Sequence, residues 1–159
     1  MQIIKKSAVF SPCRKYRYSL TRAWSLNQKP ALFIGLNPST ADEKNDDPTI
    51  RRCMHYAYEW GFGGLIMLNL FAFRATLPSD LRKSKFPVGK ENNQFIIDSQ
   101  HEAGIVVVAW GNNGNLLNRD QEVLQLISNP MCLNINNSGQ PAHPLYQRKD
   151  ISPKKYIFL

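Results

Sequence analysis

The sequence predicts a single three-layer α/β/α domain, residues 1–159, with a central, mainly parallel sheet of about four strands. Three observations support this prediction. The length of 159 residues suits one domain. Short apolar runs alternate along the chain with stretches of helical periodicity, which is typical of α/β folds. The runs are apolar throughout, as expected for parallel strands that helices cover on both faces.

Four buried strands follow from these apolar runs. They are ALFIGL (31–36), GLIMLNLF (64–71), GIVVVAWG (104–111) and MCLNI (131–135). The connections between parallel strands are expected to be right-handed. The RYSL run in the basic N-terminal segment, residues 1–29, fits an edge strand. We expect this segment to pack onto the domain.

Three helices are expected between the strands. Asp47-Pro48 supplies an N-cap and a helix-starting proline. The apolar stripe of this helix comprises Ile50, Cys53, Met54, Ala57 and Trp60, and it ends at Gly61. A second helix covers about 90–102. The third carries its apolar residues on one side: Leu116, Leu117, Val123, Leu124 and Ile127.

Composition excludes several classes of protein. With 43% hydrophobic and 20% charged residues, the chain is not a disordered protein. Its apolar runs are far shorter than the roughly 18–20 residues that span a bilayer, and its N-terminus lacks the features of a signal peptide. Cys13, Cys53 and Cys132 are scattered, and we interpret them as small buried residues in a reducing compartment. We expect a cytoplasmic monomer without a membrane partner or a cofactor.

The net charge of +8 is concentrated at the two ends of the chain. Residues 1–29 carry seven basic and no acidic residues, residues 148–159 have a net charge of +3, and the middle has a net charge of −2. If the ends meet, they form one positive face that suits nucleic acid; the alternative is solvated surface charge. The residues expected to contact phosphates are Arg14, Arg17, Arg22, Arg51, Arg52, Arg148 and Lys149. Of these, Arg51 and Arg52 lie in the first turn of the first helix, whose N-terminus favours anions.

Polar and aromatic residues follow each predicted strand, at the edge where parallel α/β sheets bind ligands. We therefore expect one cleft there. Its candidate residues are Asn37, Pro38, Ser39, Thr40 and Asp42 after the first strand, Asn69, Phe71 and Arg74 at the second, Trp110 and Gly111 at the third, and His143 after the fourth.

Each of these residues also has a purely structural interpretation. Pro38 holds Asn37 extended, so its carboxamide could hold a water or read a base edge, or it could simply end the strand as an Asx-turn. His143 lies in a stiff loop and could donate to a leaving group, or it could be an ordinary surface histidine. Phe71 and Trp110 could stack on a base or pack in the core.

The acidic residues Asp42, Asp46 and Asp47 offer a metal-binding alternative, because clustered carboxylates can hold Mg²⁺ for phosphoryl chemistry. Against this alternative, Asp47 is already explained as a helix N-cap, and no partner carboxylate follows another strand. We expect no metal.

Seven motifs, in this order, resemble the bacterial and phage family known as domain of unknown function sixteen forty-three. They are RYSLTRAW, GLNPSTAD, DDPTIRRC, NLFAFRAT, PVGKEN, AWG and GQPAHPLY, and the resemblance covers roughly residues 16–148. This resemblance implies no established activity.

Two shorter motifs are similar to those of the uracil-DNA glycosylase superfamily, particularly its mismatch-specific thymine/uracil branch. GLNPS resembles the first motif, and HPL (143–145) resembles the His-Pro-Ser motif, with Leu145 in place of serine. The resemblance implies a uracil-DNA-glycosylase-like fold. It also implies that Asn37 positions the attacking water, Asn69 reads the flipped base, Phe71 stacks on it, His143 supports its departure, and loop 38–40 compresses the DNA backbone.

The sequence thus leads to a hydrolase hypothesis: a DNA glycosylase-like protein that cleaves the N-glycosidic bond of a flipped, modified or mismatched base, with nucleic acid, and DNA in particular, as its partner. Three alternatives remain open. They are a non-catalytic module that binds a modified base, a metal-dependent nuclease that uses Asp42, Asp46 and Asp47, and an enzyme acting on free nucleosides or nucleotides.

Overall fold

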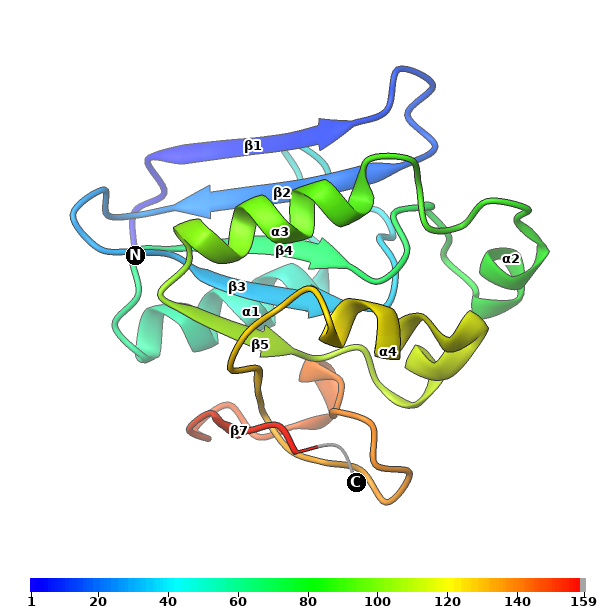
Figure 1. Ribbon diagram of the computed structural model, residues 1–159. Coiled ribbons are helices and arrows are strands. Elements are labelled where there is room, and N and C mark those ends of the chain that lie inside the picture. Colours follow the sequence, from blue (N-terminus) through cyan, green and yellow to red (C-terminus); the bar gives the residue numbers. More distant parts are fainter. Residues whose placement is uncertain (158–159) are drawn as a thin grey trace.

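A mixed β-sheet forms the centre of the molecule in the computed structural model, which describes residues 1–157 (Figure 1). Within these residues seven strands are ordered β1-β2-β4-β3-β5-β6-β7. Their bounds are β1 Lys5–Phe10, β2 Arg17–Ala23, β3 Ala31–Gly35, β4 Gly64–Asn69, β5 Ile105–Val108, β6 Met131–Cys132 and β7 Lys154–Lys155. The inner strands β4, β3, β5 and β6 are parallel neighbours, whereas β1, β2 and β7 pair antiparallel.

The mixed α/β class is as predicted, but residues 1–157 form seven strands and not about four. The four predicted buried strands correspond to β3, β4, β5 and β6, of which β6 has only two residues. The RYSL run lies in β2, which is not an edge strand, because β1 pairs along its outer side. The sequence KKSAVF of β1 was missed since half of its residues are exposed and its apolar pattern is weak.

Helices cover both faces of the sheet. Their bounds are α1 Pro48–Glu59, α2 Pro78–Lys83, α3 Asn92–Glu102 and α4 Arg119–Leu124, with short 3₁₀ segments η1 Asn112–Asn118 and η2 Pro144–Tyr146. Helix α1 begins as predicted: the Asp47 side chain accepts a hydrogen bond from the Ile50 N–H at 2.9 Å, and Pro48 is the first helical residue. Helix α2 was not among the helices expected from the sequence, although Pro78 stands at its start.

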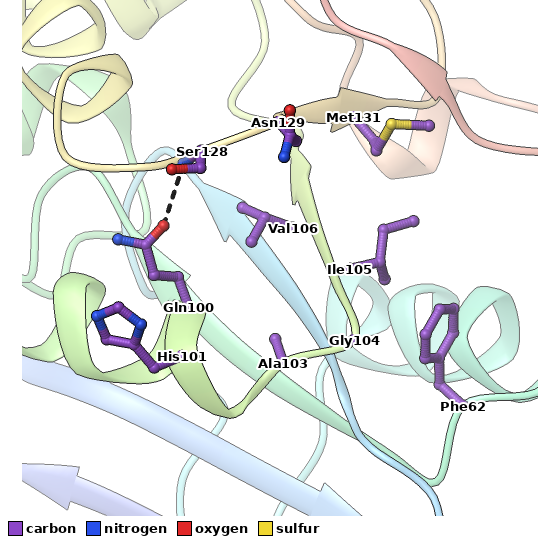
Figure 2. A pocket seen from close by; sticks show the side chains of 10 residues that line it. All are labelled: Phe62, Gln100, His101, Ala103, Gly104, Ile105, Val106, Ser128, Asn129 and Met131. Carbon is purple, nitrogen blue, oxygen red and sulfur yellow. Dashed lines mark hydrogen bonds between the residues drawn. The ribbon is translucent and has the colours of Figure 1, made fainter.

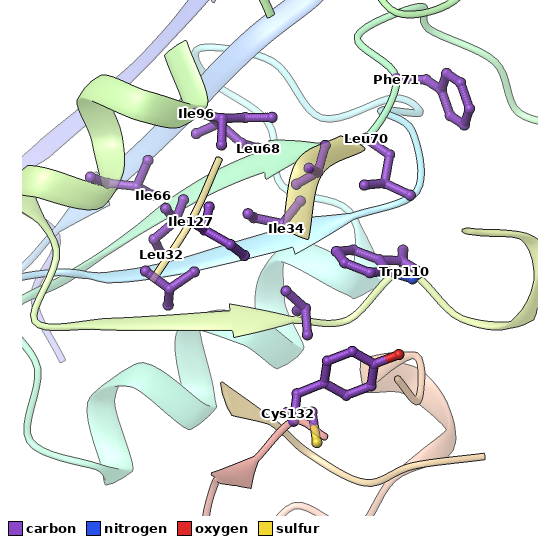
Figure 3. Close-up of a cluster of buried hydrophobic side chains, with 14 of the residues drawn as sticks. Leu32, Ile34, Ile66, Leu68, Leu70, Phe71, Ile96, Trp110, Ile127 and Cys132 are labelled. Carbon is purple, nitrogen blue, oxygen red and sulfur yellow. The ribbon is translucent and has the colours of Figure 1, made fainter. Parts of the chain in front are cut away.

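Two hydrophobic clusters lie on the two faces of the sheet. Ile96 of α3 and Val123 of α4 belong to one cluster, together with Leu32, Ile34 and further strand residues (Figure 3). On the opposite face, α1 contributes a second set, which consists of Ile50, Cys53, Met54, Tyr56 and Ala57. The sheet is therefore buried on both sides, as its uniformly apolar strands require.

The third predicted helix is broken. Leu116 and Leu117 have non-helical backbone angles, and Leu117 adopts a positive φ of 55° with 64% of its surface exposed. The regular helix begins only at Arg119. Val123 and Ile127 are nevertheless buried, so the apolar spacing predicted burial correctly but not one continuous helix.

The basic ends of the chain lie at opposite edges of the sheet, so the condition for one positive face, that the two ends meet, is not fulfilled. Strands β1 and β2 form one edge, and β7 forms the other (Figure 1). Cys53 and Cys132 are buried as expected, but Cys13 is exposed. Among residues 1–157, no helix has both the length and the apolar character that a membrane span needs.

Candidate functional site

A cleft of about 500 Å³ opens at the carboxyl edge of the parallel strands. It lies where the topology switches, because the chain runs from β3 to its neighbour β4 and then crosses to β5 on the other side of β3. The first turn of α1 and the 143–146 segment also line it. The cleft brings together eight of the predicted residues: Arg17, Asn37, Pro38, Ser39, Asn69, Trp110, Gly111 and His143.

A neighbouring hollow shares Ser39 with this cleft. Thr40, Arg74 and Arg14 line the hollow and do not line the cleft. Arg14 and Arg74 both lie over the Phe10 ring, at 4.0 and 4.9 Å from its centroid. Both guanidinium groups therefore lie beside the mouth of the cleft, on the side of β1 and β2, and that of Arg14 also pairs with Glu43 at 2.9 Å.

Asn37 is held by its amide nitrogen. Its Nδ2 donates to the carbonyl of Ala75 at 2.7 Å and to that of Pro38 at 3.1 Å. Both bonds use the donor side of the carboxamide, and no described residue donates to Oδ1. The carboxamide oxygen is thus the available group, which suits holding a water better than reading a base edge with both donor and acceptor.

His143 has a defined tautomer. Its Nδ1 accepts a hydrogen bond from the Leu145 N–H at 3.2 Å and so caps η2. Burial lowers the pKa of His143 below its ordinary value of 6.5, although the negative charge of Asp47 opposes the shift. The imidazole is therefore neutral at pH 7 and carries its proton on Nε2, which makes Nε2 a hydrogen-bond donor within the cleft lining.

This lowered pKa predicts a dependence of stability on pH. Because the folded state resists protonation of His143, the unfolded chain binds more protons as the pH falls through about 6.5. The stabilisation is present above that pH and is lost below it. We expect the melting temperature of the wild type to fall more between pH 7 and pH 5 than that of His143→Asn, which keeps a capping oxygen. Parallel curves for the two proteins would contradict the prediction.

The floor of the cleft depends on a glycine. Gly35 pairs with Asn69 in the parallel register, and a Cβ atom at position 35 would lie 2.8 Å from Asn69 Oδ1 and 2.9 Å from the Met67 side chain. Only glycine lets Asn69 occupy this space. Asn69 is 2% exposed, and its Nδ2 is buried without a hydrogen-bond acceptor.

The two predicted stacking residues are core residues. Phe71 is completely buried in the cluster of Figure 3, so its ring is not available to a base, which corrects its expected position. Trp110 is 1% exposed, and its Nε1 donates to Gln140. Tyr146, which sequence reasoning missed, lines the cleft with 84% of its surface exposed and lies 5.6 Å from the His143 ring. In the sequence, the only signal for Tyr146 as a site residue is its position immediately after the HPL motif.

The three clustered aspartates have separate structural partners. Asp42 accepts from the backbone N–H groups of Lys44 and Asn45, which lowers its pKa to about 2. Asp46 pairs with Arg22 at 2.8 Å, and Asp47 caps α1. Among the residues that the structure describes, no group of three His, Cys, Asp or Glu side chains could hold a metal ion.

Several cations predicted to contact phosphates bind protein groups instead. Arg22 is fully buried, and Arg51 donates to the Asp46 carbonyl. Arg52 donates to the carbonyls of Pro144 and Gln147, so it holds the histidine loop against α1. Arg148 pairs with Asp150 but is 80% exposed in its side chain. Lys149, the last of the set, lines a separate hollow beside Trp60.

A cavity of about 550 Å³ lies at the opposite edge of the sheet, around the start of β5 (Figure 2). Its lining includes Phe62, Ile105 and Met131. The side chain of Gln100, which also lines it, donates to the Leu126 carbonyl and accepts from the Ser128 N–H. None of the candidate residues that follow the strands lies there. The carboxyl-edge cleft is therefore the candidate site.

Comparison with known proteins identifies one family. A family model described as a protein of unknown function (DUF1643) matches residues 17–145, which is more than half of the chain. No curated protein and no solved structure matches. The first resemblance drawn from the sequence is thus confirmed, and the similarity to uracil-DNA glycosylases stays a prediction.

Proposed function

The chain belongs to the family of proteins of unknown function DUF1643, and from the chemistry of its cleft we propose that it hydrolyses the N-glycosidic bond of a flipped, modified or mismatched base in DNA. A uracil-DNA-glycosylase-like layer arrangement is part of this proposal. One observation carries it. The same cleft is lined by a carboxamide whose free group is its oxygen, that of Asn37, and by a neutral imidazole whose free group is a donor, that of His143.

These two groups suit the two halves of the reaction. The C1′–N bond breaks with its electron pair on the base, and negative charge develops there while the sugar becomes positive. The Nε2–H of His143 donates to the departing base, which stabilises that charge in a site of low dielectric. The Oδ1 of Asn37 accepts a hydrogen bond from the water that adds to C1′, and the proton that this water loses balances the proton that the base gains.

Extrusion of the base costs a few kcal/mol, which contacts in the cleft have to offset. The exposed ring of Tyr146 supplies a stacking face at the mouth of the cleft, the role first expected of Phe71. Arg74 flanks one side of the cleft mouth and suits a contact with a phosphate, as does Arg14, which is exposed but paired with Glu43. Binding through such cations weakens with added salt and does not depend on base sequence.

Base release from duplex oligonucleotides tests the proposal. The panel contains uracil, thymine opposite guanine, and hydroxymethylated and glucosylated pyrimidines, with EDTA present and alkali used to reveal abasic sites. We expect release by the wild type and a loss of about 10²-fold or more for Asn37→Ala, because the water loses its acceptor. The control, Asn113→Ala, lies in the same lining but is exposed.

The other outcomes identify the alternatives. Retained DNA binding with no release across the panel would replace the hydrolase with a module that reads modified bases. Strand breaks that EDTA abolishes would indicate the nuclease. If DNA binding is absent and nucleosides are cleaved without a response to salt, the substrate is a free nucleoside or nucleotide.

A further inference from the structure

The floor of the cleft holds two buried hydrogen-bond donors that have no acceptor. Arg17 is 2% exposed and Asn69 is also 2% exposed. The Nε of Arg17 and the Nδ2 of Asn69 are both buried without a partner. Both residues line the cleft. Buried polar groups in proteins are nearly always hydrogen-bonded, so two orphaned donors in one cleft indicate a missing acceptor.

Arg17 differs in this respect from the other buried arginines. Arg22 pairs with Asp46 at 2.8 Å, and Arg119 pairs with Glu122 at 3.2 Å. Among the described residues, the guanidinium of Arg17 has no carboxylate within 4.0 Å, and its one hydrogen bond runs from Nη1 to the Ala41 carbonyl at 3.1 Å. A buried cation without a counter-ion is costly, because burial strips its hydration and no opposite charge replaces it.

The surroundings of Arg17 compensate its charge only in part, through Asp47, which also lines the cleft. Burial lowers its pKa to about 10, so the guanidinium is still protonated at neutral pH. Arg22 and Arg74 add to the positive potential, whereas Asp47 opposes it. Asp47 is committed to its role as the cap of α1, where it accepts from the Ile50 N–H. Thr49 and Ile50, in the first turn of this 12-residue helix, also line the cleft, and that end of a helix favours anions.

We propose that the floor of the cleft is an oxyanion site, in which Arg17 and Asn69 bind a phosphate or carboxylate group of the ligand. A neutral carbonyl would satisfy the two donors but would leave the guanidinium charge unpaired. An oxyanion satisfies both, because it accepts several hydrogen bonds and carries the opposite charge. This inference rests on the proposed function and makes it more specific: the nucleotide that enters the cleft carries an acidic group, either an ester phosphate on its sugar or a carboxyl on its base.

Calorimetric titration and thermal shift with four small probes test the site on the whole protein. The probes are thymidine 5′-monophosphate against thymidine, and 5-carboxy-2′-deoxycytidine against 2′-deoxycytidine. We expect one anionic probe to bind at least about 10-fold more tightly than its neutral counterpart and to raise the melting temperature. The first pair reports a phosphate source and the second a carboxyl source. Equal affinity of each anion and its neutral counterpart would overturn the proposal.

Variants locate the site. Arg17→Met removes the charge with little change in volume, and Asn69→Asp introduces a carboxylate on the floor. Both are expected to weaken the anionic probe by about 10–100-fold. Without ligand, Arg17→Met is expected to melt no lower than the wild type, because the unpaired buried charge is gone. Arg82→Met removes an exposed guanidinium from α2, outside the cleft lining, and is the control that should bind normally. Unchanged binding by Arg17→Met, with a lower melting temperature, would assign Arg17 to structure alone and overturn the proposal.

The two proposals fail separately. Base release together with equal binding of anionic and neutral probes would leave the glycosylase intact and remove the oxyanion site. Arg17-dependent binding of an anionic probe without any base release would support the site and remove the hydrolase.

Discussion

His143→Asn is expected to slow base release by about 10²–10³-fold while leaving DNA affinity nearly unchanged. The reason is that the two ring nitrogens of His143 have different roles. Nδ1 is occupied by the Leu145 N–H, so only Nε2–H remains to stabilise the departing base. Asparagine is a favourable capping residue, and its short side chain keeps an acceptor for Leu145 but does not extend to the position of Nε2.

Single-turnover kinetics and DNA binding, measured on the same preparations, check this expectation. Tyr146→Phe serves as the matched control, because it keeps the ring beside His143 and removes only a hydroxyl. An unchanged single-turnover rate for His143→Asn would exclude the histidine from the chemistry. A loss of DNA affinity equal to the loss of rate would make His143 a binding residue.

Arg22→Met is expected to lower the free energy of unfolding by about 3 kcal/mol, because the buried donors to Asp46 and to the Asp42 carbonyl are lost and only Lys6, at 3.9 Å, remains beside Asp46. Arg22 is 0% exposed. Its Nε donates to Asp46 at 2.8 Å, and its Nη2 donates to the Asp42 carbonyl at 2.6 Å. It thereby ties β2 to the loop that leads into α1, and its predicted contact with phosphate is not possible from this position.

Urea denaturation measures this effect. The control is Arg51→Met, which removes an exposed guanidinium from the first turns of α1 and is expected to change stability by no more than about 0.5 kcal/mol. Together with Arg17→Met, the experiment compares two buried arginines on the same strand, one paired and one unpaired. A loss of less than about 1 kcal/mol for Arg22→Met would show that the ion pair contributes little.

Sequence reasoning located the candidate cleft because each of its signals was local. The Asn37-Pro38 turn, the Asp47-Pro48 cap and the apolar strands depend on neighbouring residues, and the rule that parallel strands bind ligands at their carboxyl edge joined them. The roles of individual residues were harder to predict from the sequence. Phe71 and Trp110 follow strands just as Asn37 does, but the packing of α3 and α4 over that face buries them.

The burial and the electrostatic partner of each arginine were the least predictable properties. Arg14, Arg17 and Arg22 lie close together in a basic segment and were assigned one role, yet the structure exposes the first and buries the other two in different environments. Alternation along β2 alone does not distinguish a paired arginine from an unpaired one. The distinction depends on the 41–47 loop, which offers Asp46 to Arg22 but only a backbone carbonyl to Arg17.

The sequence by itself determined the family, the mixed α/β class, the four parallel strands and the capped start of α1, because apolar periodicity and capping chemistry act over a few residues. Only the tertiary structure decided that β1 covers β2, that the basic ends lie at opposite edges, and that Arg17 and Asn69 share a cleft with Asn37 and His143. These features depend on pairing between distant segments, and the burial and electrostatic partner of a side chain exist only once those segments have packed.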